Sequence, residues 1–205
     1  MFDPVLFASF AIAATLLAMT PGLDTVMVLR ASITNGSAPA LYAAVGILLG
    51  CIAWGAAVSL GLGAVLQASE LMYMAIKLAG AGYLMWLGIN LILKPRKALD
   101  SDQAEPAGTG MQAFWQGLVT NLLNPKIGIF YVSFLPQFIP AGADVAVYSF
   151  MLACVHTLIS ALWFGALIVL SKQLRKVLFK PTVVSMMDRV TGGLFIALGY
   201  KLAKS

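Results

Sequence analysis

Long apolar runs, separated by short polar segments, are the feature that most restricts how this chain can fold. A helix that crosses the ~30 Å hydrocarbon core of a bilayer needs about 20 predominantly apolar residues. Six runs reach that scale, at Val5–Leu29, Ala38–Leu66, Leu71–Leu93, Met111–Phe134, Val145–Ser171 and Val183–Lys201. The alternation of period two that marks membrane β-barrels is absent from them. A backbone in lipid must satisfy its own hydrogen bonds, so the runs predict an all-α polytopic membrane protein with six transmembrane helices.

The composition excludes the main classes of soluble protein. Of 205 residues, 60% are apolar and only 10% are charged, whereas an ordinary soluble domain has roughly 25% charged residues. So few charges cannot cover a water-facing surface, which argues against a soluble enzyme, a disordered chain or a nucleic-acid-binding module. We expect a single transmembrane domain over residues 1–205 whose surroundings are the lipid bilayer, with no nucleic acid as partner.

Basic residues concentrate after the first, third and fifth runs. They are Arg30, Lys94, Arg96, Lys97, Lys172, Arg175, Lys176 and Lys180. Because cytoplasmic loops carry an excess of Lys and Arg, these segments are predicted to face the cytoplasm and both termini the outside. A five-helix alternative, with one run re-entrant, would put the termini on opposite sides. The first run follows an acidic start and precedes no small-residue cleavage pattern, so we expect a retained span rather than a signal peptide.

The two halves of the chain resemble each other. A segment rich in charge, Pro and Gly, at about 94–110, separates residues 1–93 from residues 111–205, with three runs in each half. Because an odd number of spans per half makes the halves enter the membrane in opposite directions, the pattern predicts two inverted three-helix repeats, as in many secondary transporters. Helix packing alone also favours glycine. The matching pieces are Thr20-Pro21 with Asn124-Pro125, and Gly82 and Gly88 with Gly193 and Gly199.

A proline interrupts the first run and another interrupts the fourth. Proline breaks a helix interior but fits the first helical position behind a capping residue. Thr20-Pro21 and Asn124-Pro125 therefore predict that helices one and four are broken and restart inside the protein, each with a cap and a first-position proline. A restarting helix presents free N–H groups and a partial positive charge, which suit a carboxylate.

Each predicted break carries a charged residue, Asp24 in the first and Lys126 in the second. We expect these to be the only charges well inside the spans, where an unpaired charge costs at least about 2.5–3.5 kcal/mol. Their opposite signs predict a zwitterion site in which Lys126 and the helix ends bind a carboxylate and Asp24 binds an ammonium group. The alternative is an ion pair that locks the two halves. The predicted substrate-binding residues are Thr20, Pro21, Gly22, Asp24, Asn121, Asn124, Pro125 and Lys126.

The remaining reactive residues give weaker signals. His156 and Ser160 are one turn apart, but no oxyanion-hole pattern accompanies them, so we predict no catalytic residues. His156 is interpreted as a hydrogen-bonded packing residue, with a proton relay as the alternative. Two cysteines and one histidine cannot build a structural zinc site, so neither a metal nor a cofactor is expected. Cys51 and Cys154 are expected to be buried and unbonded.

Three motifs in order are similar to those of the LysE/RhtB family of bacterial amino-acid exporters. They are Pro21-Gly22-Leu23-Asp24, where the family has PGPD or close to it; Lys77-Leu78-Ala79-Gly80-Ala81-Gly82-Tyr83-Leu84; and Asn121-Leu122-Leu123-Asn124-Pro125-Lys126. The resemblance covers nearly the whole chain and departs from the family pattern at Leu23, where a second proline is usual.

The resemblance implies a multi-pass protein of the bacterial inner membrane that exports amino acids, driven by protons. Asp24 is then the expected proton-coupling residue, and the amino acid carried stays open. A membrane channel and a non-transporting assembly protein are the alternatives. Exposed glycine faces would permit a homodimer.

Overall fold

The computed structural model describes residues 3–96, 110–178 and 180–204. Within these ranges the chain is helical and contains no strand, which confirms the all-α prediction. The elements are α1 (Pro4–Met19), α2 (Leu23–Thr34), α3 (Ser37–Ala68), α4 (Glu70–Leu93), α5 (Met111–Leu122), α6 (Pro125–Phe134), the 3₁₀ turn η1 (Leu135–Phe138), α7 (Val145–Val169), α8 (Ser171–Leu178) and α9 (Pro181–Lys204). Most of the predicted charged segment, residues 97–109 with Lys97, lies outside the described residues.

Four of the described helices, α3, α4, α7 and α9, are each long and apolar enough to cross a membrane. The pairs α1–α2 and α5–α6 meet the same criteria jointly, with bends of 53° and 51° at their breaks. Counted as spans, these pairs bring the number to six. The prediction that helices one and four are broken is therefore confirmed, at the two places where proline interrupts the apolar runs.

The outer surface is apolar along these helices. Large apolar side chains such as Leu60, Leu71, Leu162 and Val147 are at least 70% exposed. A soluble monomer rarely exposes apolar surface on this scale, whereas lipid solvates it. The chain is a multi-pass membrane protein.

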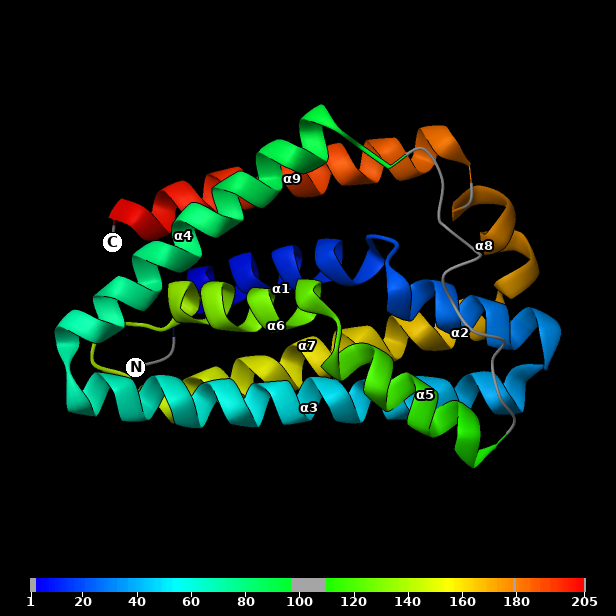
Figure 1. Ribbon diagram of the computed structural model, residues 1–205, viewed down its shortest axis with the longest axis horizontal. Helices are drawn as coiled ribbons and strands as arrows, with labels where there is room; N and C mark the ends of the chain where they lie inside the picture. The colour runs from blue at the N-terminus through cyan, green and yellow to red at the C-terminus, as the bar shows by residue number, and fades with distance from the viewer. Residues whose placement is uncertain (1–2, 97–109, 179, 205) are drawn as a thin grey trace.

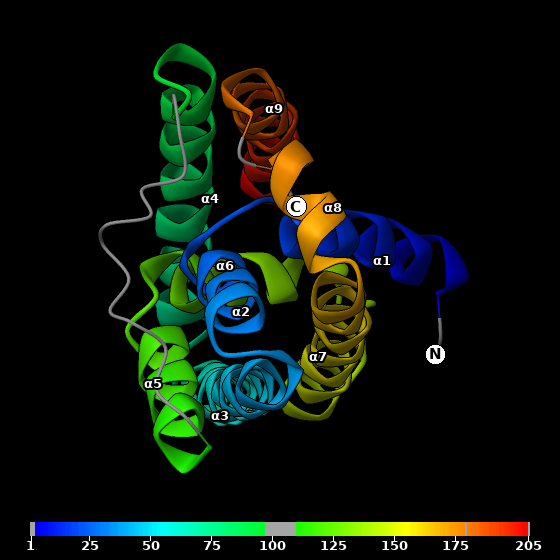
Figure 2. The same cartoon turned by 90° about the vertical axis from the view of Figure 1, so that its right-hand side faces the viewer.

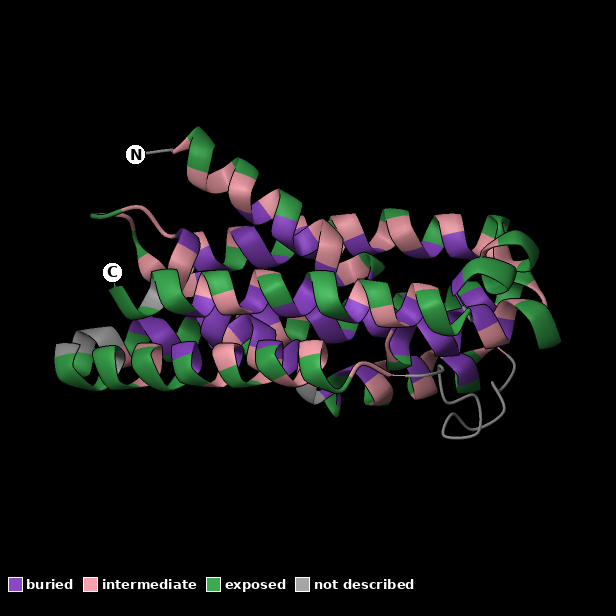
Figure 3. Ribbon diagram, turned by 90° about the horizontal axis from the view of Figure 1, so that it is seen from above, coloured by how far each residue is buried: buried purple, intermediate pink, exposed green. Residues whose placement is uncertain are grey.

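The helices surround two short ones near the long axis. Figure 2 shows α2 and α6 near the middle with the other helices around them, and Figure 3 shows that buried residues concentrate on the inward faces. α3 packs along α5 and α7, and α4 packs along α9. The proposed repeat equates α3 with α7 and α4 with α9, and each of these pairs is in contact; the repeat itself stays a prediction.

Small residues allow the closest helix contacts. A Cβ added at Gly88 would lie 2.5 Å from the Gly192 carbonyl oxygen, and one at Gly46 would overlap the Phe114 carbonyl group. The α4–α9 and α3–α5 pairs therefore have backbones in direct contact, as small residues permit in membrane helices. Of the predicted glycine pairs, Gly88 packs closely in this way, while Gly82 has open space beside it.

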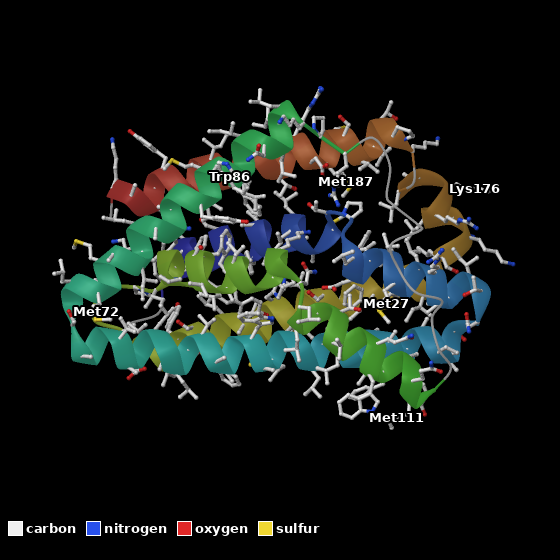
Figure 4. All side chains as sticks on the ribbon, viewed as in Figure 1. Met27, Met72, Trp86, Met111, Lys176 and Met187 are labelled. Atoms are coloured by element: carbon white, nitrogen blue, oxygen red, sulfur yellow. The ribbon has the colours of Figure 1, made fainter. Side chains whose placement is uncertain are left out.

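The first turn of α1 and the last turn of α9 lie at the same end of the molecule (Figure 1), as six crossings require. The basic helix α8 lies at the opposite end, where Figure 4 labels Lys176. Which end faces the cytoplasm stays a prediction. One packing expectation is wrong: Cys51 is buried, but Cys154 is exposed because its position on α7 turns away from the neighbouring helices.

Candidate functional site

At the first break, the chain leaves α1 at Met19 and restarts as α2 at Leu23. The predicted cap is wrong: Thr20 ends α1 instead of beginning α2, and Pro21 lies in the extended link. The physical reason is that the Thr20 hydroxyl is already used, because it donates to the Leu16 carbonyl at 2.6 Å and lies 2.6 Å from the Thr191 hydroxyl of α9. α2 therefore begins behind Gly22, without a side-chain cap.

At the second break, the sequence prediction is confirmed. Asn124 is the N-cap of α6, and its side-chain oxygen accepts a hydrogen bond from the Lys126 backbone N–H at 3.1 Å. Pro125 occupies the first position of the helix, where its missing N–H leaves no donor unsatisfied. The side chain of Pro125 lies outside the described part of the structure.

Asp24 lies in the first turn of α2 and is 8% exposed. Its carboxylate accepts hydrogen bonds from the side-chain amides of Asn121 at 2.9 Å and Asn124 at 3.3 Å. The positive end of the α2 dipole also favours an acid here. The acid of the first break is thus held by two amides of the second.

Lys126 lies at the start of α6 and reaches across to the first break. Its ammonium group donates to the carbonyl oxygens of Leu17 at 3.2 Å and Thr20 at 3.0 Å, at the C-terminal end of α1. A cation at a helix C-terminus compensates for the unpaired carbonyl groups there. Each break therefore supplies a charged group that the other break stabilises.

A small cavity lies between the two breaks. The space open to the centre of a water molecule is about 30 Å³, room for about one or two waters. Five predicted site residues line it, namely Thr20, Gly22, Asp24, Asn124 and Lys126. Asn121 reaches it through Asp24. The other lining residues are Leu17, Ala18, Thr25, Ile47, Cys51, Ile127, His156, Ser160 and Phe164.

The charged residues of the spans differ from the prediction in two respects. Among the described residues, no ion pair within 4.0 Å joins Asp24 to Lys126, so the simple locking pair is not formed. A third charge, Asp188, is fully buried in α9 and pairs with Arg96. The expectation of only two charges inside the spans is therefore wrong; an aspartate next to the exposed Arg189 gave no sign in the sequence of being buried.

Sequence reasoning also missed the wall of the cavity that α7 supplies. His156, Ser160 and Phe164 follow one another at intervals of four residues and therefore share a helix face. The first two attracted attention as a pair, but nothing in the sequence placed them opposite the breaks, because that placement depends on how α7 packs against α1 and α2.

The bundle and its small, charged cavity between two broken spans define a helical membrane protein with a central polar site. The chain belongs to the LysE type translocator family, whose model matches residues 15–205. The predicted family resemblance is thereby confirmed.

Individual relatives cover nearly the whole chain. The sequence is 29% identical over 200 residues to the membrane protein YrhP of Bacillus subtilis (strain 168), covering 94% of this chain and 95% of the relative. It is 29% identical over 212 residues to a leucine efflux protein of Enterobacter sp. (strain 638), covering 98% and 97%. It is 26% identical over 198 residues to a homoserine/homoserine lactone efflux protein of Salmonella typhimurium, covering 96% and 95%. No solved structure gives a significant match.

Proposed function

We propose that this protein exports amino acids from the bacterial cytoplasm and that the cavity between the two helix breaks is its substrate site. The observation that carries the proposal is the placement of Asp24 and Lys126 on the same small cavity. An amino acid presents one ammonium and one carboxylate group, which these two side chains complement. The names of the related leucine and homoserine efflux proteins support the same class of substrate.

The cavity is far smaller than an amino acid, so the two breaks must separate for a substrate to enter. Entry replaces contacts that already exist. The carboxylate takes over the Lys126 ammonium group from the α1 carbonyl oxygens, and the ammonium group competes with the two amides for Asp24. Because each charged side chain exchanges its present partners for a substrate group of opposite charge, neither charge lies unpaired in the low-dielectric interior.

Proton antiport follows from Asp24 being the one acid among the described residues that line the site. Asp24 binds either a proton or the substrate's ammonium group, since protonation removes the charge that attracts the ammonium. Binding of one therefore releases the other, and movement of the two halves around the site exposes it to alternate sides. The proposal does not require catalytic chemistry, a metal or a cofactor.

The test is efflux from cells preloaded with each of the labelled amino acids. Asp24→Asn and Lys126→Met keep the shapes of the side chains but remove the charges, and each should abolish export while the protein still reaches the membrane. Asp144→Asn, at the N-cap of α7, and Lys201→Met, in the last turn of α9, are the matched controls outside the site. Near-normal export by either site variant would exclude that residue from the site.

A channel would also pass amino acids, but only down their gradient. Export by the wild-type protein against a concentration gradient, collapsed by a protonophore, supports proton-driven transport. Efflux that only equilibrates the labelled amino acid and is indifferent to the protonophore would instead assign a channel.

A further inference from the structure

The α7 wall of the cavity contains a histidine whose hydrogen bonding is incomplete. His156 is 1% exposed, and its Nδ1 atom lies 3.0 Å from the Tyr131 hydroxyl group of α6. Its other nitrogen, Nε2, is buried and has no hydrogen-bond partner within the described residues. In the described part of the chain, Nε2 of His156 is the one buried polar side-chain atom of the cavity lining that has no hydrogen-bond partner.

The two charged residues of the cavity differ from His156 in this respect. Asp24 has two amide donors and Lys126 has two carbonyl acceptors. Buried polar groups are nearly always paired, because an unpaired one loses its hydration without compensation. Other buried polar atoms of the described residues, such as Trp54 Nε1 and Ser149 Oγ, also have no partner, but they belong to side chains that do not line the cavity.

The imidazole ring is also held in a fixed orientation. Its centroid lies 5.1 Å from that of Phe130 and 5.5 Å from that of Tyr131, the second in an edge-to-face arrangement. Both aromatic residues belong to α6, which begins at the second break. Two aromatic contacts and a hydrogen bond at Nδ1 fix the position of Nε2 before any ligand arrives.

We propose that His156 is a substrate-contacting residue whose Nε2–H donates a hydrogen bond to the carboxylate of the bound amino acid. The inference rests on the proposed function and adds a residue to its site. When the Tyr131 hydroxyl donates to Nδ1, the ring hydrogen is placed on Nε2, so Tyr131 is a positioning residue that selects the tautomer. We assign the carboxylate as the acceptor because Asp24 already binds the ammonium group of the substrate.

The test compares apparent KM and kcat in proteoliposomes for the amino acid that the wild-type protein exports in the preloading assay. His156→Leu combined with Tyr131→Phe removes the donor without leaving an unpaired hydroxyl, and should raise KM at least about tenfold, equivalent to about 1.4 kcal/mol. His156→Gln keeps an amide N–H near the position of Nε2 and should stay within about threefold of the wild-type KM. Thr15→Val, whose hydroxyl donates to the Ala11 carbonyl within α1 and does not line the cavity, is the matched control.

A measurement of thermal stability distinguishes the loss of a substrate contact from a loss of packing in the variant. The double variant should unfold in detergent at a temperature no lower than the wild type, because it replaces an incompletely paired polar group by apolar ones. An unchanged KM in the double variant would overturn the inference, as would a His156→Gln variant as impaired as the double one.

The two proposals fail in different ways. If Asp24→Asn abolishes export while the double variant keeps the wild-type KM, only the role of His156 falls. If the wild-type protein exports no amino acid, the proposed function falls and the role of His156 falls with it.

Discussion

The ion pair between Arg96 and Asp188 provides the sharpest test of how this bundle is stabilised. Two guanidinium nitrogens of Arg96 donate to the two carboxylate oxygens, at 3.0 and 2.5 Å, and the Arg96 backbone N–H donates at 2.9 Å. The Arg96 side chain is 40% exposed, while Asp188 is fully buried. The pair fastens the chain after α4 to the first half of α9.

Arg96→Met should lower the free energy of unfolding by about 2–3 kcal/mol. Removal of one partner of a buried pair typically costs about 3–5 kcal/mol, because the other charge stays buried without compensation. The cost is expected to be smaller here because Arg96 is partly exposed to water and the backbone N–H still reaches Asp188. Arg96→Met together with Asp188→Leu removes both charges and should restore most of the loss.

Unfolding by SDS in mixed micelles measures these changes, and the wild type, Arg96→Met, Asp188→Leu and the double variant form a double-mutant cycle. Arg189→Met, one residue from Asp188 but exposed, is the matched control and should have little effect. An Arg96→Met protein as stable as the wild type would refute the reasoning. A double variant no more stable than Arg96→Met would also contradict it, because the loss would then come from packing rather than from the uncompensated carboxylate.

Three further predictions concern packing and the helix breaks. Gly46→Ala should lower the free energy of unfolding by about 1–3 kcal/mol, because its Cβ overlaps the α5 backbone. Gly61→Ala on the same helix has open space and should be neutral or stabilising by up to about 1 kcal/mol. SDS unfolding compares the two variants, and equal losses of stability would contradict the close contact between Gly46 and α5. Asn124→Ala should lose about 1 kcal/mol with the α6 cap, while Asn124→Ser keeps a cap but loses the amide donor to Asp24, so it should unfold like the wild type yet export less in the preloading assay. Thr20→Val should cost about 1 kcal/mol by removing the hydroxyl contact with α9, and the same unfolding assay should show almost no effect for the exposed control Thr34→Val.

Much of the architecture could be predicted because membrane helices leave strong signals in sequence. The apolar runs gave the spans to within a few residues, since lipid fixes their length and excludes other backbone structures. The cap at Asn124 was also predictable, because it depends only on the local chemistry of Asn followed by Pro.

The failures share one physical cause. Thr20 follows the same local rule as Asn124, but its hydroxyl is engaged by Thr191 of α9, a contact between residues far apart in the chain. The burial of Asp188 depends on Arg96, and the role of the α7 face depends on how α7 packs against α1 and α2. Tertiary contacts of this kind leave no periodic pattern in a single sequence, so they were visible only in the structure.

The side chain of Asn124 belongs to both interrupted helices at once. Its oxygen holds the first turn of α6, and its nitrogen holds the acid of α2. A rotation of this amide breaks both of these hydrogen bonds together, while Asn121 still donates to the Asp24 carboxylate, and withdrawal of α2 leaves the Asn124 nitrogen without its acceptor. In the proposed transport cycle the two breaks, joined through this one amide, should therefore open in concert, and intermediates with only one break displaced should be scarce.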